Sequence, residues 1–102
     1  MTRSDYLKFH AEFTERARSL SDRKNQDYSD DDDAFANLNL CEVVCPGMSC
    51  EQGIVVRMSD KLARLGRLLQ RDASVPEESI EDTLLDVVNY AVLLAARRSQ
   101  RP

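Results

Sequence analysis

The stretch EESIEDTLLDVVNYAVLLAA, residues 77–96, decides the fold. Its length and composition predict a single helix, and from Leu84 onward the helix is apolar on nearly every side. A helix that is apolar all round is normally buried rather than laid on a surface. In so short a chain this predicts that the core is completed by oligomerisation, with other subunits covering the helix.

One polar stripe enters this apolar helix. Glu78, Asp82 and Asp86 stand at positions i, i+4 and i+8, and Asn89 continues the line. Residues four apart share a helix face. A carboxylate inside a buried helix is costly unless a charged partner meets it. The stripe therefore predicts that a metal ion or a nearby Arg or Lys lies against Asp86.

Composition sets the class of protein. The 102 residues suit one domain, residues 1–102, and a net charge of −4 argues against a nucleic-acid partner. Residues 84–96 are too short for a membrane span, and no signal peptide is evident. The three cysteines cannot all pair within one chain, which favours a reducing, cytoplasmic setting.

An all-α fold is expected, because the chain has few glycines, prolines or β-branched runs. Apolar spacing predicts a bundle of about four helices, over residues 3–25, 35–44, 50–71 and 77–96. Three of them follow possible caps: Thr2 with Asp5 (or Ser4 alone), Ser49 with Gln52, and Ser74 with Glu77.

An acidic segment, residues 24–38, separates the first two predicted helices. Five of the seven residues from Asp27 to Asp33 are Asp, and no helical or strand period continues there, so a loop is predicted. The spacing does not fit a calcium-binding loop, which needs a central Gly and a final Glu. Tyr28 and Phe35 flank the acidic run. They could stack on a planar base or anchor the loop to the core, and spacing alone favours neither.

Cys41, Cys45 and Cys50 form a C-x3-C-x4-C pattern. A structural zinc site usually needs four ligands, and here the fourth would have to be His10, far away in sequence. Packing of small side chains is therefore the favoured interpretation of these cysteines.

The third predicted helix carries Asp60 among cations, including Arg57, Lys61 and Arg64. Salt bridges along the helix surface would explain this pattern. The alternative is an Asp that reaches a metal ion, flanked by cations that reach phosphates. A short connection makes the third and fourth helices antiparallel neighbours, so Asp60 would face the acidic stripe. Clustered carboxylates suit Mg²⁺ or Mn²⁺ and metal-assisted attack of water on a phosphoanhydride. No P-loop motif is present.

Four segments in order carry a family resemblance: KNQDY (24–28), DAFANL (33–38), GIVVRMSDKLARL (53–65) and ESIEDTLLDVVNYA (78–91). Together they resemble the MazG-like all-alpha nucleoside triphosphate pyrophosphohydrolases, and more closely their nucleotide-modification-associated branch in phages and bacteria. The resemblance covers residues 24–96.

The resemblance implies hydrolysis of a (d)NTP to the monophosphate and pyrophosphate with Mg²⁺ or Mn²⁺. It also implies a homodimer or homotetramer in a bacterial or phage-infected cytoplasm. A purine dNTP such as dGTP, used in phage nucleotide-pool or modified-base metabolism, is the substrate it suggests. The family's pattern is E-x-x-E on one helix and E-x-x-D on the next. The chain departs from both, because Arg57 stands where a Glu is expected and Thr83 takes the position three residues before Asp86.

The residues expected at the site follow from these patterns. The catalytic and metal-binding set is Asp60, Asp82 and Asp86, with Glu78 as a further metal ligand or Glu51 assisting. The resemblance implies substrate contacts at Lys24, Asp27, Tyr28, Phe35 and Asn37. The cations of the third helix and the polar stripe of the fourth add Arg57, Lys61, Arg64 and Asn89. The missing E-x-x-E keeps a second hypothesis open, a non-catalytic helical module that binds a nucleotide or a protein.

Overall fold

The computed structural model describes residues 1–28, 33–71, 74 and 76–101. Helices account for most of this part of the chain, and no β-strand forms in it, so the all-α prediction is confirmed. The four helices are α1 (Arg3–Tyr28), α2 (Ala36–Val44), α3 (Cys50–Gln70) and α4 (Glu77–Ser99). None of the helices in these residues is long and apolar enough to cross a lipid bilayer.

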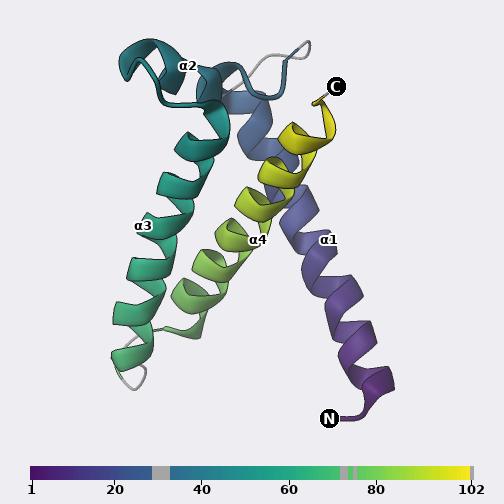
Figure 1. Ribbon diagram of the computed structural model, residues 1–102. Helices are drawn as coiled ribbons and strands as arrows, with labels where there is room; N and C mark the ends of the chain where they lie inside the picture. Colours follow the sequence, from purple (N-terminus) through teal and green to yellow (C-terminus); the bar gives the residue numbers. More distant parts are fainter. Residues whose placement is uncertain (29–32, 72–73, 75, 102) are drawn as a thin grey trace.

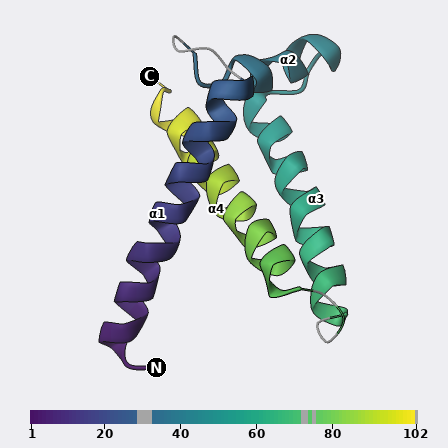
Figure 2. The same cartoon turned by 180° about the vertical axis from the view of Figure 1, so that it is seen from behind.

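Helix α4 is the centre of the arrangement (Figures 1 and 2). It packs against α3 on one side and against α1 on the other, and α2 packs against α3. Helices α3 and α4 run antiparallel, as the short connection between them predicts (Figure 1). Toward its N-terminus α1 diverges from α4 in both views, so the first half of α1 lies apart from the other helices.

Side-chain caps explain where two helices begin. The Thr2 hydroxyl accepts a hydrogen bond from the Asp5 amide at 3.0 Å, and the Thr2 amide donates to the Asp5 carboxylate at 3.3 Å. Ser49 and Gln52 form the same reciprocal box before α3. Both predicted caps are confirmed. The predicted cap of α4 is wrong, because Pro76 precedes the helix without any side-chain cap and the Ser74 hydroxyl donates to the Arg71 carbonyl instead.

The predicted loop over residues 24–38 begins too early. Helix α1 continues to Tyr28, so the KNQDY segment is helical rather than part of the loop. Tertiary contacts account for the extension: Lys24 forms an ion pair with α4, and the Asn25 amide group donates to the Ala34 carbonyl at 3.1 Å. Such contacts override the weak helix propensity of Asn and Asp in the last turns.

A small core joins α2 to α3. Phe35, Leu38, Cys50 and Ile54 are buried together, and Ile54 is 0% exposed. Side chains from α3 and α4 pack around this cluster: Met58, Tyr90, Leu93 and Leu94. The core lies at the end of the molecule where α2 crosses, so it supports the residues of α2 and α4 that line the candidate site.

In the single chain α4 is not buried all round, and its burial by other subunits stays a prediction. Val92 is 60% exposed and Leu84 is 37% exposed, although Ile80 and Leu85 on the same helix are buried. Helix α4 packs mainly against α1 and α3 and meets the start of α2 through Tyr90 and Leu93, and part of its apolar surface stays open to solvent.

Candidate functional site

An ion-pair network joins three helices at Asp86. The two Asp86 carboxylate oxygens contact Lys24 Nζ of α1 at 2.7 Å and Lys61 Nζ of α3 at 3.1 Å. The Asp86 side chain is 14% exposed, whereas the two lysines are more open to solvent. The sequence predicted a metal ion or a nearby cation against this carboxylate, and in the single chain two ammonium groups take this position.

The environment of Asp86 shifts its titration. Burial raises the pKa of the carboxyl group, but the hydrogen bonds and positive charges of Lys24 and Lys61 outweigh burial. The pKa therefore lies below its ordinary value of 3.8. Asp86 is an anion at neutral pH, and its charge attracts both lysines.

We expect this network to make folding stability sensitive to acid. A depressed folded-state pKa stabilises the fold above the unfolded value, and this contribution is lost as the pH falls through the lower folded value. Urea unfolding of the protein and of Asp86→Asn, compared between neutral pH and about pH 3, isolates this component. The parent should lose more stability than the variant. An equal loss in both proteins would show that Asp86 titrates alike in the folded and unfolded chain.

A pocket of about 410 Å³ lies beside this network. Its volume falls within the roughly 300–1,000 Å³ of small-molecule sites. Five of the residues that the sequence assigns to the site line this pocket: Lys24, Asn37, Arg57, Asp86 and Asn89. They come from α1, α2, α3 and α4, so the fold collects them from four separate segments.

The pocket holds an unsatisfied hydrogen-bond donor. Asn89 Nδ2 is buried and has no hydrogen-bond partner among the described residues. A buried amide group without a partner costs free energy that a bound acceptor can restore. A ligand with a carbonyl or phosphoryl oxygen supplies such an acceptor, so Asn89 is suited to ligand contact.

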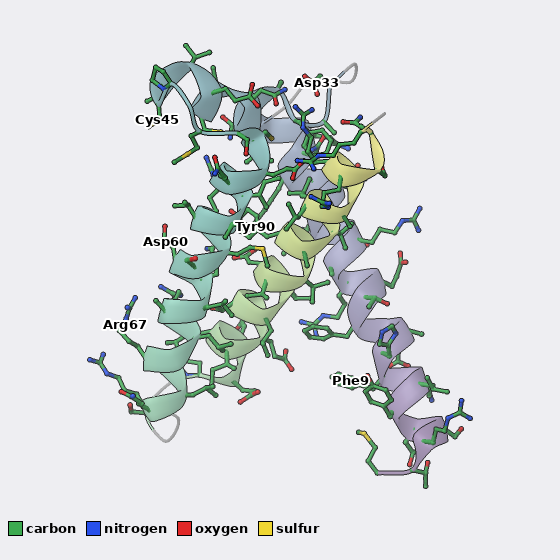
Figure 3. The ribbon with its side chains drawn as sticks, in the orientation of Figure 1. Phe9, Asp33, Cys45, Asp60, Arg67 and Tyr90 are labelled. Carbon is green, nitrogen blue, oxygen red and sulfur yellow. The ribbon has the colours of Figure 1, made fainter. Side chains whose placement is uncertain are left out.

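The carboxylates predicted to share a metal ion lie in different places. Asp86 lines the pocket, and Asp82 lines a second cavity of about 300 Å³ between α1 and α4. Asp60 and Glu78 are exposed and line neither cavity, and Figure 3 shows Asp60 pointing away from α4. Within the part of the chain that the structure describes, no three His, Cys, Asp or Glu residues are grouped to hold a metal. The described part of one chain does not bring these carboxylates together, so a metal site shared by them stays a prediction.

The other predicted substrate contacts are also dispersed. Phe35 is 5% exposed in the core, with the Arg97 guanidinium 5.6 Å from its ring centroid. This position favours the anchoring interpretation over base stacking. Lys61 contacts Asp86 without lining the pocket, and Arg64 is exposed. The side chains of Asp27 and Tyr28 lie outside the described residues, as does most of the acidic run.

Glu51, an assisting ligand in the sequence interpretation, is engaged elsewhere. Its carboxylate contacts Arg101 through two bonds of 2.9 Å and Arg98 at 3.2 Å. Such forked pairing with arginine is stronger than a single hydrogen bond. Glu51 therefore ties the start of α3 to the end of α4.

The cysteines occupy three different environments. Cys50 is 1% exposed in the core, where burial raises the pKa of its thiol. Cys41 lies against α3, because a Cβ added to Gly53 would meet its sulfur at 2.8 Å. Cys45 is exposed. Packing therefore accounts for Cys41 and Cys50.

Sequence reasoning missed several pocket residues. Tyr90 follows Asn89 directly, and it packs on the side of α4 that faces α3 (Figure 3). Ser21 lies three residues before Lys24, and Asn25 follows Lys24 directly. A prediction that continued α1 through KNQDY would have placed both residues beside Lys24 on the helix. The remaining missed residues are small or apolar: Ala34, Leu38 and Leu93.

Comparison with known proteins adds no relative: no family model, curated protein or solved structure matches this chain.

Proposed function

We propose that the pocket binds a nucleoside triphosphate and that the protein hydrolyses it to the monophosphate and pyrophosphate. The observation that carries the proposal is the meeting of Lys24, Arg57 and Asn89 in one pocket with Asp86. These residues come from segments that resemble MazG-like hydrolases. The same resemblance favours a purine dNTP such as dGTP.

The charges of the pocket support a phosphate ligand. Lys24 and Arg57 line it, and Lys61 lies against Asp86 nearby, so cations outnumber the one carboxylate among the lining residues. Arg and Lys donate strong, charge-assisted hydrogen bonds to phosphate oxygens. Asn89, with Asn25 and Asn37, adds amide groups that can read the polar edge of a base or sugar.

Asp86 has a positioning role in this proposal. Its carboxylate fixes Lys24 and Lys61 at 2.7 and 3.1 Å, which holds two long side chains in one place before a ligand arrives. Because these side chains are already ordered in the free protein, they lose less conformational entropy when a ligand binds. An incoming phosphate can then use cations whose direction is already set.

Mg²⁺ or Mn²⁺ belongs to the proposal as the ion that the triphosphate carries. The described residues of one chain do not fit a separate multi-carboxylate centre, because both oxygens of Asp86 contact ammonium groups and no other carboxylate lines the pocket. Magnesium in nucleotide sites often uses few protein carboxylates together with substrate phosphates.

A second function shares this pocket. The lysine-paired state of Asp86 favours a non-catalytic module that binds a nucleotide and leaves it intact. Both functions require binding in the pocket, and they differ only in whether the phosphoanhydride bond is broken.

Binding is tested with a matched pair of arginines on α3. Arg57 lines the pocket, whereas Arg64, also exposed, does not. We expect Arg57→Ala to weaken nucleotide binding about 10- to 100-fold, the equivalent of one hydrogen bond to a charged group. Isothermal titration with a nucleoside triphosphate and Mg²⁺ measures this change.

Arg64→Ala is the control and should bind within about twofold of the parent, because an exposed charge outside the site contributes little. Loss of affinity in the Arg64 variant with none in the Arg57 variant would move the phosphate site out of the pocket.

The proposal also includes assembly into a homodimer or homotetramer. Helix α4 is exposed at Leu84 and Val92, and α1 is exposed at Tyr6, Leu7 and Phe9. Large apolar side chains left open on several helices are typical of a chain that buries more surface on association.

A further inference from the structure

The surface of the single chain is larger than a compact monomer needs. Its accessible area is 7,495 Å². A folded monomer of this mass is expected to expose about 5,800 Å², so about 1,700 Å² is in excess. The radius of gyration of 15.6 Å also exceeds the roughly 13 Å of a compact domain of this length.

This excess is enough for a stable contact between subunits. A standard interface buries about 800 Å² on each partner, and permanent dimers bury more. One standard face on each chain would therefore cover about half of this excess area, and a larger contact of the permanent kind would cover more of it.

One face of α3 has the properties of such a contact. Taking 100° per residue, a sector of about 140° between Gln52 and Gln70 holds no charged side chain. Four aliphatic residues on it are each about half exposed: Val55, Val56, Leu62 and Leu69. We name these four residues, with the small residues between them, the uncharged face of α3.

The small residues of this face permit close helix packing. Ser59, Ala63 and Gly66 are all exposed. A Cβ added at Gly66 would meet nothing within 4 Å among the residues that the structure describes. Gly53 on the same helix differs, because there Cys41 fills the space. A glycine in mid-helix costs stability, and close approach of another backbone is a common reason for one.

Charged residues border the face without entering it. Asp60 and Arg67 point away from α4 (Figure 3), and their positions on the helix place them at the rim of the uncharged sector. An apolar centre with a charged rim is the usual anatomy of a subunit contact.

Other exposed apolar groups form less continuous surfaces. On α1, Tyr6, Leu7 and Phe9 alternate with Arg3, Asp5 and Lys8. On α2, Leu40, Val43 and Val44 lie on a helix of only nine residues. The uncharged face of α3 extends along most of a 21-residue helix.

We infer that the uncharged face of α3 packs against the same face of a second copy of this chain across a two-fold axis. Identical uncharged faces are self-complementary, which is what a two-fold contact requires. This inference rests on the proposed self-association and is independent of nucleotide hydrolysis. It assigns the contact to α3, not to the apolar surface of α4.

Light scattering during size-exclusion chromatography tests the inference. The parent protein should have twice the chain mass of 11.6 kDa, and Leu62→Glu should have the mass of one chain. Val43→Glu is the control, because Val43 is even more exposed, at 76%, but lies on α2. It should keep the mass of the parent. Circular dichroism checks that each variant remains helical.

Gly66→Glu gives a second test that does not depend on whether the fold accepts a charge at position 62. Glutamate is a better helix former than glycine, and the single chain leaves room for it, so the helix should persist while the dimer dissociates. A monomeric parent would overturn both the self-association and its face. A dimeric parent whose Leu62 and Gly66 variants stay dimeric would overturn the face alone. Nucleotide turnover, assayed separately, bears on neither result.

Discussion

Replacing Asp86 with Asn should reduce nucleotide hydrolysis at least about 100-fold, the scale seen when one preorganised group is removed from an active site. The amide has nearly the shape of the carboxylate but no charge, so Lys24 and Lys61 lose the anion that they contact at 2.7 and 3.1 Å. The cations then no longer share a fixed position beside the pocket. Steady-state release of pyrophosphate measures the loss, and circular dichroism should show unchanged helix content.

Two matched variants sharpen this test. Asp82→Asn changes a carboxylate of the same helix that lines the second cavity. Equal losses in the Asp82 and Asp86 variants would indicate a carboxylate site shared between them, as the sequence predicted. Asp22→Asn changes an exposed residue of α1 and should keep the parent rate. Undiminished turnover in Asp86→Asn would remove Asp86 from the mechanism.

Replacing Ile54 with Ala should destabilise the fold by about 2–5 kcal/mol, the usual cost of truncating a fully buried aliphatic side chain. Ile54 is 0% exposed and packs with Phe35, Leu38 and Cys50. The net stability of a small domain is only about 5–15 kcal/mol, so this loss is a large fraction of it. Urea unfolding followed by circular dichroism measures the change.

A smaller truncation of the same side chain should cause a smaller loss of folding stability. Ile54→Val should cost about 0.5–1.5 kcal/mol, because it removes one methyl group. Val43→Ala, at a position 76% exposed, should change stability by less than about 0.5 kcal/mol. If Ile54→Ala were as stable as Val43→Ala, the core that supports Leu38 and the α2 side of the pocket would be wrongly assigned.

Much of the fold could be predicted from local patterns. Helix boundaries near residues 3, 50 and 77 follow from changes in composition, and the caps at Thr2 and Ser49 are determined by neighbouring residues. The end of α1 was missed because contacts from Lys24 and Asn25 to distant residues hold its last turns. Such contacts leave no periodic signal in the sequence.

The candidate site could be predicted in its residues but not in its geometry. Charge and spacing identified Lys24, Arg57, Asp86 and Asn89, and the fold brings them to one pocket. The same spacing placed Asp82 with Asp86, whereas a shift of four residues moves Asp82 along the helix to a different cavity. The free-energy cost of burying an unpaired carboxylate indicated that Asp86 needs a cationic partner. Only the packing of three helices decides that the partners are lysines.

The central claim is that the pocket binds and hydrolyses a nucleoside triphosphate. The most direct measurement incubates the protein with each common dNTP and NTP in the presence of Mg²⁺ or Mn²⁺ and separates the products. The account predicts a nucleoside monophosphate and pyrophosphate from one or a few bases, with dGTP among them, and no such products from Asp86→Asn. No turnover of any nucleotide with either metal would contradict hydrolysis, and release of diphosphate and phosphate would contradict the proposed bond cleavage.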